Sequence, residues 1–187
     1  MNQPRKEFII SITARDRVGI IHDVAGEISY MNGDLADMRQ QVLHGCFSMI
    51  LYVSFPGTVD REEITRRLIA ISDEDSPMEV SVRELDQSLP PSADENNCYV
   101  LTASGADRIG FVATVTRFCK DHRINILDLT TTVDDDRYIM ILYVDLGDCA
   151  SMDRLRTNLA EFAEATDLNM VLQHNEIFKA TNEIKIF

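Results

Sequence analysis

The stretch Asp16-Arg17-Val18-Gly19-Ile20 returns 91 residues later as Asp107-Arg108-Ile109-Gly110-Phe111. Further matches keep this offset without a gap, because residues 49–53 and 140–144 share the sequence MILYV and Asp37 falls on Asp128. Separate blocks that agree at one offset indicate a tandem duplication. We therefore expect one fold to be present twice in the 187 residues of the chain.

Both halves show the same predicted order of strands and helices. Apolar and β-branched runs predict strands over 8–13, 35–43, 47–55 and 78–85, and over 99–103, 126–133, 138–146 and 168–173. Apolar residues at helical spacing predict helices after Gly19 and Gly110, and further helices after the expected N-caps Asp60 and Ser151. The order β-α-β-β-α-β gives an α+β fold, with two tandem ferredoxin-like domains whose antiparallel sheets carry helices on one face.

Turn signals and a linker divide the chain further. Asn32-Gly33 is expected to end the first helix in the left-handed conformation, and His44-Gly45 to form a hairpin turn. Residues 86–97 contain Pro90-Pro91 and few apolar side chains, which is typical of a linker. We expect a first domain over 7–85 and a second over 98–187, which includes a C-terminal extension.

The charge of the chain excludes some classes of function. It has 31 acidic and 18 basic side chains, a formal charge of −13 at pH 7. Because affinity for phosphates depends on Lys and Arg, we expect no direct binding of nucleic acid and no anionic membrane surface as a partner. No apolar run is long enough for a membrane helix, and the polar start has no signal-peptide core. We therefore expect a cytoplasmic protein.

Catalytic and metal-binding patterns are weak. The four cysteines have no C-x-x-C spacing and are expected to be free thiols, mostly buried. Histidines lie in different predicted elements, and there is no P-loop or H-E-x-x-H motif. Asp134-Asp135-Asp136 would suit a divalent cation, but a solvated hairpin turn is the stronger interpretation. We predict no enzyme activity, no metal site and no cofactor.

The repeated stretch lies in the loop between the first strand and the first helix of each half. A glycine at a helix start lets a ligand approach the backbone, and the free N–H groups of the first turn favour a carboxylate or phosphate. The aspartates can accept from a ligand ammonium group, cap the helix or pair with the neighbouring arginine, and the residues alone leave these interpretations open.

Each half resembles an ACT domain, a small βαββαβ module that binds amino acids and regulates metabolic enzymes or transcription. The resemblance is carried by residues 16–20 with 47–50 in the first half, by 107–111 with 125–128 and 138–141 in the second, and by the ending 173–180. It implies that the loops, Asp16 to Ile20 and Asp107 to Phe111, hold a ligand carboxylate through backbone N–H groups. It also implies a polar contact from Asn125, whose place in the first half is taken by Asp34.

The resemblance implies an amino-acid-sensing regulatory protein that acts through a protein partner, and glycine or serine is the expected ligand. Two other classes remain, a ligand-free interaction module with an acidic docking surface and, last, a small enzyme on the same fold. Alternation along the strands at 47–55 and 138–146 leaves apolar residues on the face away from the helices. Such a face predicts a cover, either a second sheet or the other subunit of a homodimer. The residues concerned are Ile50, Tyr52, Ile141 and Tyr143.

Overall fold

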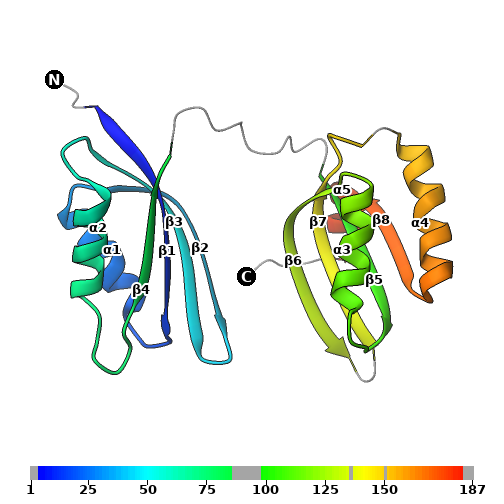
Figure 1. The fold of residues 1–187 in the computed structure, drawn as a ribbon, viewed down its shortest axis with the longest axis horizontal. Coiled ribbons are helices and arrows are strands. Elements are labelled where there is room, and N and C mark those ends of the chain that lie inside the picture. Colours follow the sequence, from blue (N-terminus) through cyan, green and yellow to red (C-terminus); the bar gives the residue numbers. More distant parts are fainter. Residues whose placement is uncertain (1–3, 86–97, 135–136, 150, 183–187) are drawn as a thin grey trace. The chain divides into compact units, whose positions relative to one another are not determined.

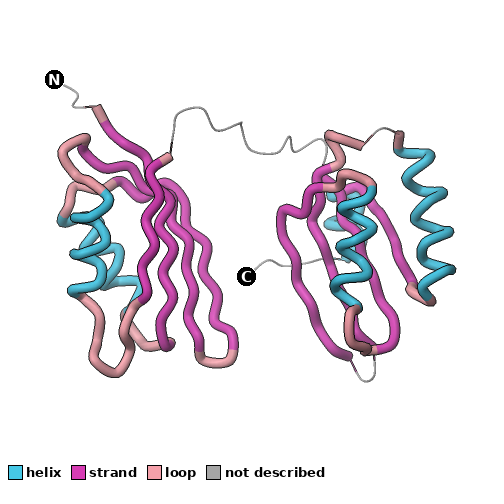
Figure 2. Tube along the Cα trace, in the orientation of Figure 1, coloured by secondary structure: helices cyan, strands magenta, loops and turns pink. Residues whose placement is uncertain are grey.

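The computed structural model describes residues 4–85, 98–134, 137–149 and 151–182, with side chains to residue 179. The chain forms two compact units, residues 1–90 and 91–187, and each contains one copy of the repeat (Figures 1 and 2). The expected linker, residues 86–97, lies outside the described residues. We refer to the described parts of the two units as the first and the second repeat.

The first repeat is a four-stranded antiparallel sheet in the order β2-β3-β1-β4, with both helices on one side (Figure 1). Its core consists of alternate strand residues and the inward side of the two helices, as the sequence pattern predicts. Its elements are β1 (Arg5–Arg15), α1 (Ile20–Tyr30), β2 (Asp34–Leu43), β3 (Cys46–Pro56), α2 (Arg61–Ala70) and β4 (Glu79–Glu84).

The second repeat has the same topology, with the strand order β6-β7-β5-β8. The predicted fold class is therefore confirmed, as are the N-caps: Asp60 accepts from the Glu63 N–H at 2.8 Å and Ser151 from the Arg154 N–H at 3.5 Å. Its elements are β5 (Cys98–Ala106), α3 (Phe111–Asp121), β6 (Asn125–Asp134), β7 (Arg137–Asp145), α4 (Met152–Thr166) and β8 (Asn169–His174).

A β-bulge near the start of the second strand explains the match of Asp37 with Asp128. The register shifts between Leu35 and Asp37, and again between Ile126 and Asp128. In each bulge the aspartate accepts a hydrogen bond from the next backbone N–H, at 2.7 Å for Asp37 and 2.8 Å for Asp128. The duplication has thus kept the residue that satisfies a backbone donor at an irregular point of the sheet.

Two of the predicted turns lie in the first repeat, at His44-Gly45 and at Asn32-Gly33. His44 and Gly45 are both left-handed, with φ of 50° and 78°, which confirms the hairpin turn. Asn32-Gly33 ends α1 as predicted, and the left-handed residue is Asn32, with φ of 55°, and not Gly33. Gly33 is small for another reason, since a Cβ there would lie 2.5 Å from the Phe55 ring. Of the predicted Asp134–Asp136 turn, residues 135 and 136 lie outside the described residues.

The sequence patterns missed a short helix, α5 (Asn175–Asn182), that follows β8. It lies on the outer face of the second sheet, the face away from α3 and α4 (Figure 1). Phe178 of α5 is buried and meets Tyr143 of β7 edge-on, with ring centroids 6.5 Å apart. Val100 points to the same face as Tyr143 and is only 1% exposed. In the second repeat, the predicted cover of the apolar outer face is therefore supplied in part by the chain itself.

Among the described residues, no helix combines the length and the apolar content that crossing a bilayer requires.

Candidate functional site

The repeated stretches form two matching loops at the ends of β1 and β5, residues 16–19 (the first loop) and 107–110 (the second loop). Gly19 and Gly110 are the N-caps of α1 and α3, and both are left-handed, with φ of 90° and 88°. Neither helix start receives a hydrogen bond from a capping side chain. The interpretation of Asp16 and Asp107 as helix caps is therefore wrong. In α3 the first N–H group, that of Phe111, donates to the Arg108 carbonyl oxygen at 3.2 Å, and no side chain caps the N–H groups that follow.

In the first loop, an arginine is fixed by a carboxylate of α1. Arg17 Nη2 lies 2.7 Å from Asp23 Oδ2, and the Arg17 side chain is 22% exposed. Arg17 Nη1 lies 4.0 Å from the place where a Cβ on Gly19 would be, so the guanidinium occupies the space over the glycine. Its Nε is buried and has no hydrogen-bond partner among the described residues. The guanidinium is held by Asp23 and by a longer hydrogen bond, 3.4 Å, from Nη1 to the Val18 carbonyl oxygen within the loop.

The second loop is open. All of its residues are exposed, and a Cβ on Gly110 would meet no atom within 4 Å. Arg108 is directed away from the glycine, because its Nη2 donates to the Thr166 carbonyl oxygen, at the end of α4, over 2.6 Å. The position of Asp23 is taken by Thr114, so the first turn of α3 contains no acidic residue. A ligand carboxylate would find unoccupied space here beside the N–H groups of Val112 and Ala113, which no side chain caps.

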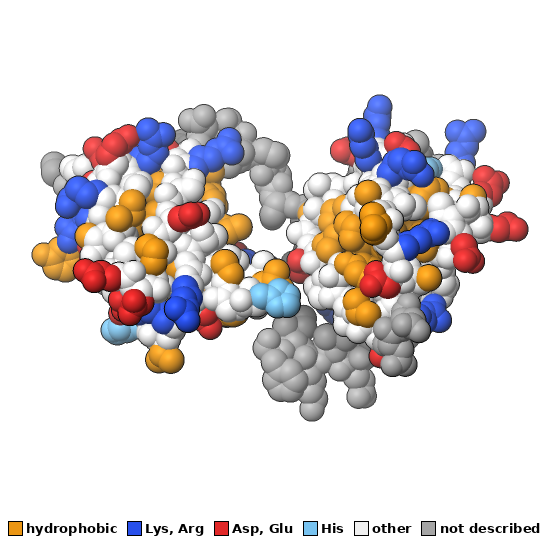
Figure 3. Space-filling view, turned by 60° about the horizontal axis from the view of Figure 1, so that its bottom comes forward, with side chains coloured by type: hydrophobic (Ala, Val, Ile, Leu, Met, Phe, Trp, Pro, Cys, Tyr) orange, Lys and Arg blue, Asp and Glu red, His pale blue; other side chains and the backbone are white. Residues whose placement is uncertain are grey.

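Each loop also presents one aliphatic side chain to solvent. Val18 is 100% exposed and Ile109 is 106% exposed, at equivalent positions of the two repeats. Hydrophobic side chains reach the surface of both units in Figure 3. Aliphatic groups this exposed contribute nothing to either core, so burial in the fold does not explain them.

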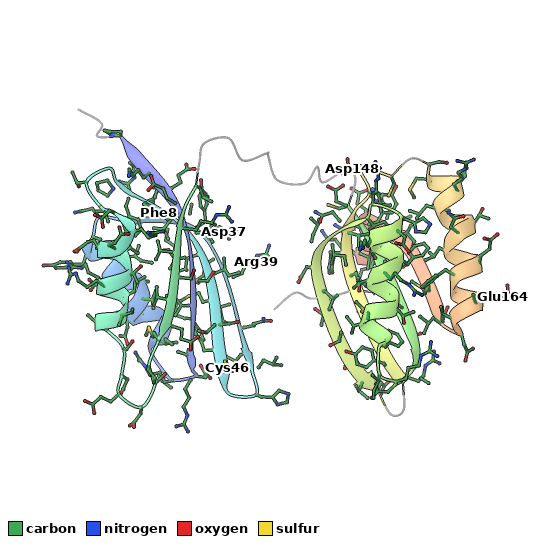
Figure 4. The ribbon with its side chains drawn as sticks, viewed as in Figure 1. Phe8, Asp37, Arg39, Cys46, Asp148 and Glu164 are labelled. Atoms are coloured by element: carbon green, nitrogen blue, oxygen red, sulfur yellow. The ribbon has the colours of Figure 1, made fainter. Side chains whose placement is uncertain are left out.

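Asp34 and Asn125 do not join the loop of their own repeat. The loop follows Arg15, which pairs with Cys46, whereas Asp34 pairs with Ser54 near the opposite end of β3. In Figure 4, Cys46 and Asp37 mark these two ends of the first sheet. The same holds in the second repeat, where Asn125 pairs with Asp145 at the far end from Arg137. Within one repeat, the loop alone is the candidate site.

Residues 72–78, the segment between α2 and β4, lie next to the first loop, and the sequence patterns did not predict this. Buried Ser76 donates to the Arg15 carbonyl oxygen over 2.6 Å, directly before the loop. This contact brings the exposed acidic residues 73–75 to the same end of the sheet. In the second repeat only Asp167 and Leu168 separate α4 from β8. The sequence signal for this segment was the longer connection between the second helix and the last strand in the first repeat than in the second.

A hollow of about 260 Å³ lies between the end of α3 and the start of α4. Its His122 is already satisfied, because Nδ1 donates to the Phe118 carbonyl oxygen at 2.9 Å and Nε2 accepts from Asn158 at 3.0 Å. Burial also raises the pKa of the nearby core thiol Cys119 to about 11, so the reactive thiolate is scarce. The described residues contain no cluster of three His, Cys, Asp or Glu side chains suited to a metal ion.

The cysteines are less buried than expected. Cys119 lies in the core, Cys149 is half-buried and Cys46 is exposed. Desolvation raises the pKa of the Cys149 thiol, with a smaller contribution from Asp145 and Asp148. Neither Cys119 nor Cys149 has the electropositive surroundings of a reactive cysteine.

The family model of the ACT domain matches this chain twice, at residues 6–83 and 97–173. The chain belongs to the ACT-domain family. Both matches contain the loop and the bulge described above, so the repeated features of the structure lie within the ACT domains. The family consists of regulatory modules that bind amino acids, and it accounts for the βαββαβ pattern found twice.

Similar proteins include single-repeat relatives and tandem ones. A UPF0237 protein of Methanopyrus kandleri is 33% identical over 86 residues, 46% of this chain and 96% of that protein. A UPF0237 protein of Neisseria meningitidis serogroup A is 35% identical over 89 residues, 47% of this chain and 99% of that protein. Each of these relatives therefore matches about half of the chain.

Two solved structures share the tandem fold. An unknown protein from Galdieria sulphuraria has a TM-score of 0.74 and 23% identity, covering 91% of this chain and 98% of its own. A protein provisionally named glycine cleavage system transcriptional repressor has a TM-score of 0.67 and 15% identity, covering 90% and 96%. At these identities the likeness concerns the fold alone.

Proposed function

We propose that this protein is a sensor of small amino acids, with glycine or serine as ligand, whose α-carboxylate is held at the start of a repeat's first helix. The observation that carries the proposal is the open second loop, where the space over Gly110 is unoccupied and the N–H groups that follow Phe111 in α3 have no capping side chain. A carboxylate there would accept from these groups and gain from the helix dipole. Membership of a family of regulatory amino-acid-binding modules supports this assignment.

The same loop offers a group for the other end of an amino acid. Asp107 is exposed and caps no helix, so its carboxylate is available to accept from the ligand ammonium group. The second loop is exposed and forms no deep pocket. Glycine and serine are small enough to make both contacts on such a surface. A loop that binds both the carboxylate and the ammonium group of its ligand would favour an amino-acid zwitterion over a simple carboxylic acid.

Regulation would then pass to a protein partner. Ile109 projects fully exposed from the loop that would hold the ligand, so a bound amino acid would lie beside an aliphatic anchor for the partner. Coupling requires that the ligand prefers the partner-bound arrangement. With a formal charge of −13, control of transcription of amino-acid metabolism genes would run through that protein and not through DNA contacts. We place this non-enzymatic activity in the cytoplasm.

The proposal includes a homodimer formed through the first sheet. Ile50 on its outer face is 54% exposed and lies opposite Ser11, two positions along the sheet from the half-buried pair Ile9 and Tyr52. No helix of the described chain follows β4 to cover this face as α5 covers the second sheet. A second copy of the chain would bury these apolar side chains.

Calorimetric titration of the full chain with glycine and with L-serine tests the proposed site. Gly110→Ala adds a methyl group that meets no protein atom but fills the space assigned to the ligand. It should weaken binding at least about tenfold, because the carboxylate can no longer approach the backbone.

The matched control is Gly45→Ala, since Gly45 has a similar φ of 78° and equally open surroundings. Both variants introduce comparable backbone strain, of about 1–2 kcal/mol. Equal loss of binding in the two variants would show that strain, and not the ligand space, is responsible. Unaltered binding to Gly110→Ala would contradict the proposed site.

A further inference from the structure

The two loops have the same backbone conformation at the glycine but differ in what occupies the space over it. In the first loop the guanidinium of Arg17 lies there, 4.0 Å from the position of an added Cβ. In the second loop the equivalent space is empty, and Arg108 is bound instead to the Thr166 carbonyl oxygen. The difference is also one of burial, since the Arg17 side chain is 22% exposed whereas Arg108 is an exposed residue.

One residue of each helix accounts for this difference. Asp23 in the first turn of α1 holds Arg17 Nη2 at 2.7 Å, and the equivalent residue of α3 is Thr114. A carboxylate in the first turn also interacts favourably with the helix dipole and so occupies the electrostatic role that a ligand anion would take. Thr114 has no charge and leaves that role open.

Residues 72–78 also make the first loop less favourable for a ligand carboxylate. Ser76 ties residues 72–78 to the Arg15 carbonyl oxygen, which places an acidic run, Asp73-Glu74-Asp75, beside the first loop. A ligand carboxylate would approach this loop against several like charges and would have to displace an ion pair. In the second repeat the corresponding connection is only Asp167 and Leu168.

We infer that the first loop is occupied by the chain's own Arg17–Asp23 pair, so that the protein binds one amino acid per chain, in the second repeat. The inference rests on the proposed function, because it selects one of two loops for the same ligand. Asp23 is then a positioning residue that keeps a potential site closed. The first repeat would serve the assembly and the second would sense the ligand.

Exchange of the two deciding residues tests this inference. Calorimetric titration with glycine and with L-serine should give one site per chain for the unaltered protein. Asp23→Thr frees Arg17 and removes the competing carboxylate, so it should raise the stoichiometry to two. Thr114→Asp places a carboxylate in the first turn of α3 and should weaken the remaining site at least about tenfold.

Two further variants test whether the effect depends on the charge of Asp23 and on its position in the fold. Asp23→Asn removes the same charge with a smaller change of shape and should also give a second site. Asp153→Thr makes the same replacement in the first turn of α4, which lies near the end of α3 and not near the second loop, and should leave one site unchanged. Thermal unfolding of each variant, followed by circular dichroism, establishes that it is folded before titration.

The outcomes separate the inference from the proposed function. Two equal sites in the unaltered chain, or a single site that persists in both Asp23 variants, would overturn the inference and leave the sensor intact. Absence of binding by both amino acids in every folded variant would overturn the proposed function, and the inference with it. One site that becomes two in the Asp23 variants and is lost in Thr114→Asp supports both.

Discussion

Replacement of Phe178 by Ala is expected to destabilise the second repeat and to leave the first repeat unchanged. Phe178 is 6% exposed, and its ring meets Tyr143 at a centroid distance of 6.5 Å. It is the aromatic contact through which α5 packs on the outer face of the sheet, where Val100 is 1% exposed. Without it, α5 would lose its buried aromatic ring and the contact with Tyr143.

The magnitude follows from what the loss of α5 would uncover. Burial of Phe is worth about 3–5 kcal/mol where the structure cannot relax around the cavity. α5 follows the last strand and can detach, so the loss cannot exceed the free energy with which it docks. In the first repeat, Ile9 occupies the position of Val100 and is only half-buried. We therefore expect a loss of about 2–3 kcal/mol, or about 10 °C in Tm.

Hydrogen exchange followed by mass spectrometry is the suitable assay, because it reports each repeat separately. The chain contains no tryptophan, and its two cores lie in separate units. Exchange should accelerate in β5 and β8, the strands that α5 contacts, and remain unaltered in β1 and β4. The control is Lys179→Ala, which changes an exposed side chain of the same helix and should have little effect.

Three results would refute this reasoning. Unaltered exchange of β5 in Phe178→Ala would show that α5 does not protect the outer face. Equal acceleration in both repeats would show that the effect passes between units, contrary to separate cores. A matching effect of Lys179→Ala would attribute the change to the helix itself and not to the buried ring.

Other predictions concern thiol reactivity and assembly. Iodoacetamide at pH 8 should modify exposed Cys46 but spare Cys119, whose pKa burial raises to about 11; peptide mass spectrometry checks this, and early modification of Cys119 in the folded chain would contradict it. Ile50→Arg places a charge on the outer face of the first sheet and should halve the mass measured by light scattering; a monomeric mass of the unaltered protein would exclude the dimer.

The fold could be predicted because the same pattern occurs twice. A strand such as β3 shows strict alternation, with Phe47, Met49 and Leu51 buried and their neighbours outward. Its counterpart repeats this order, so an ambiguity in one half is resolved by the other. The β-bulges could not be predicted, although Asp37 and Asp128 match at the repeat offset, because a bulge depends on register between strands and not on local composition.

α5 and the acidic segment could not be predicted in the same way. α5 has eight residues and occurs once, so neither periodicity nor duplication distinguishes it from an irregular tail. The contact of Ser76 with Arg15 joins residues far apart in the sequence. The Arg17–Asp23 pair is local in sequence, but which carboxylate Arg17 contacts depends on the orientation of its side chain. The sequence suggests the adjacent Asp16 for that role, and in the structure it belongs to Asp23.

The two repeats show which features the duplication has kept and which have diverged. Both retain the left-handed glycine, the uncapped helix start and the aspartate of the bulge, which the backbone of this fold requires. The side chains that set the charge at the loop and at the start of the second strand have changed, from Asp23 to Thr114 and from Asp34 to Asn125. Each change replaces a carboxylate with a neutral group in the second repeat. Asp34 and Asn125 lie at the end of the sheet opposite to the loop, so only the change from Asp23 to Thr114 bears on the proposed site. Under the proposed function, the loss of that carboxylate would favour an anionic ligand group in the second repeat.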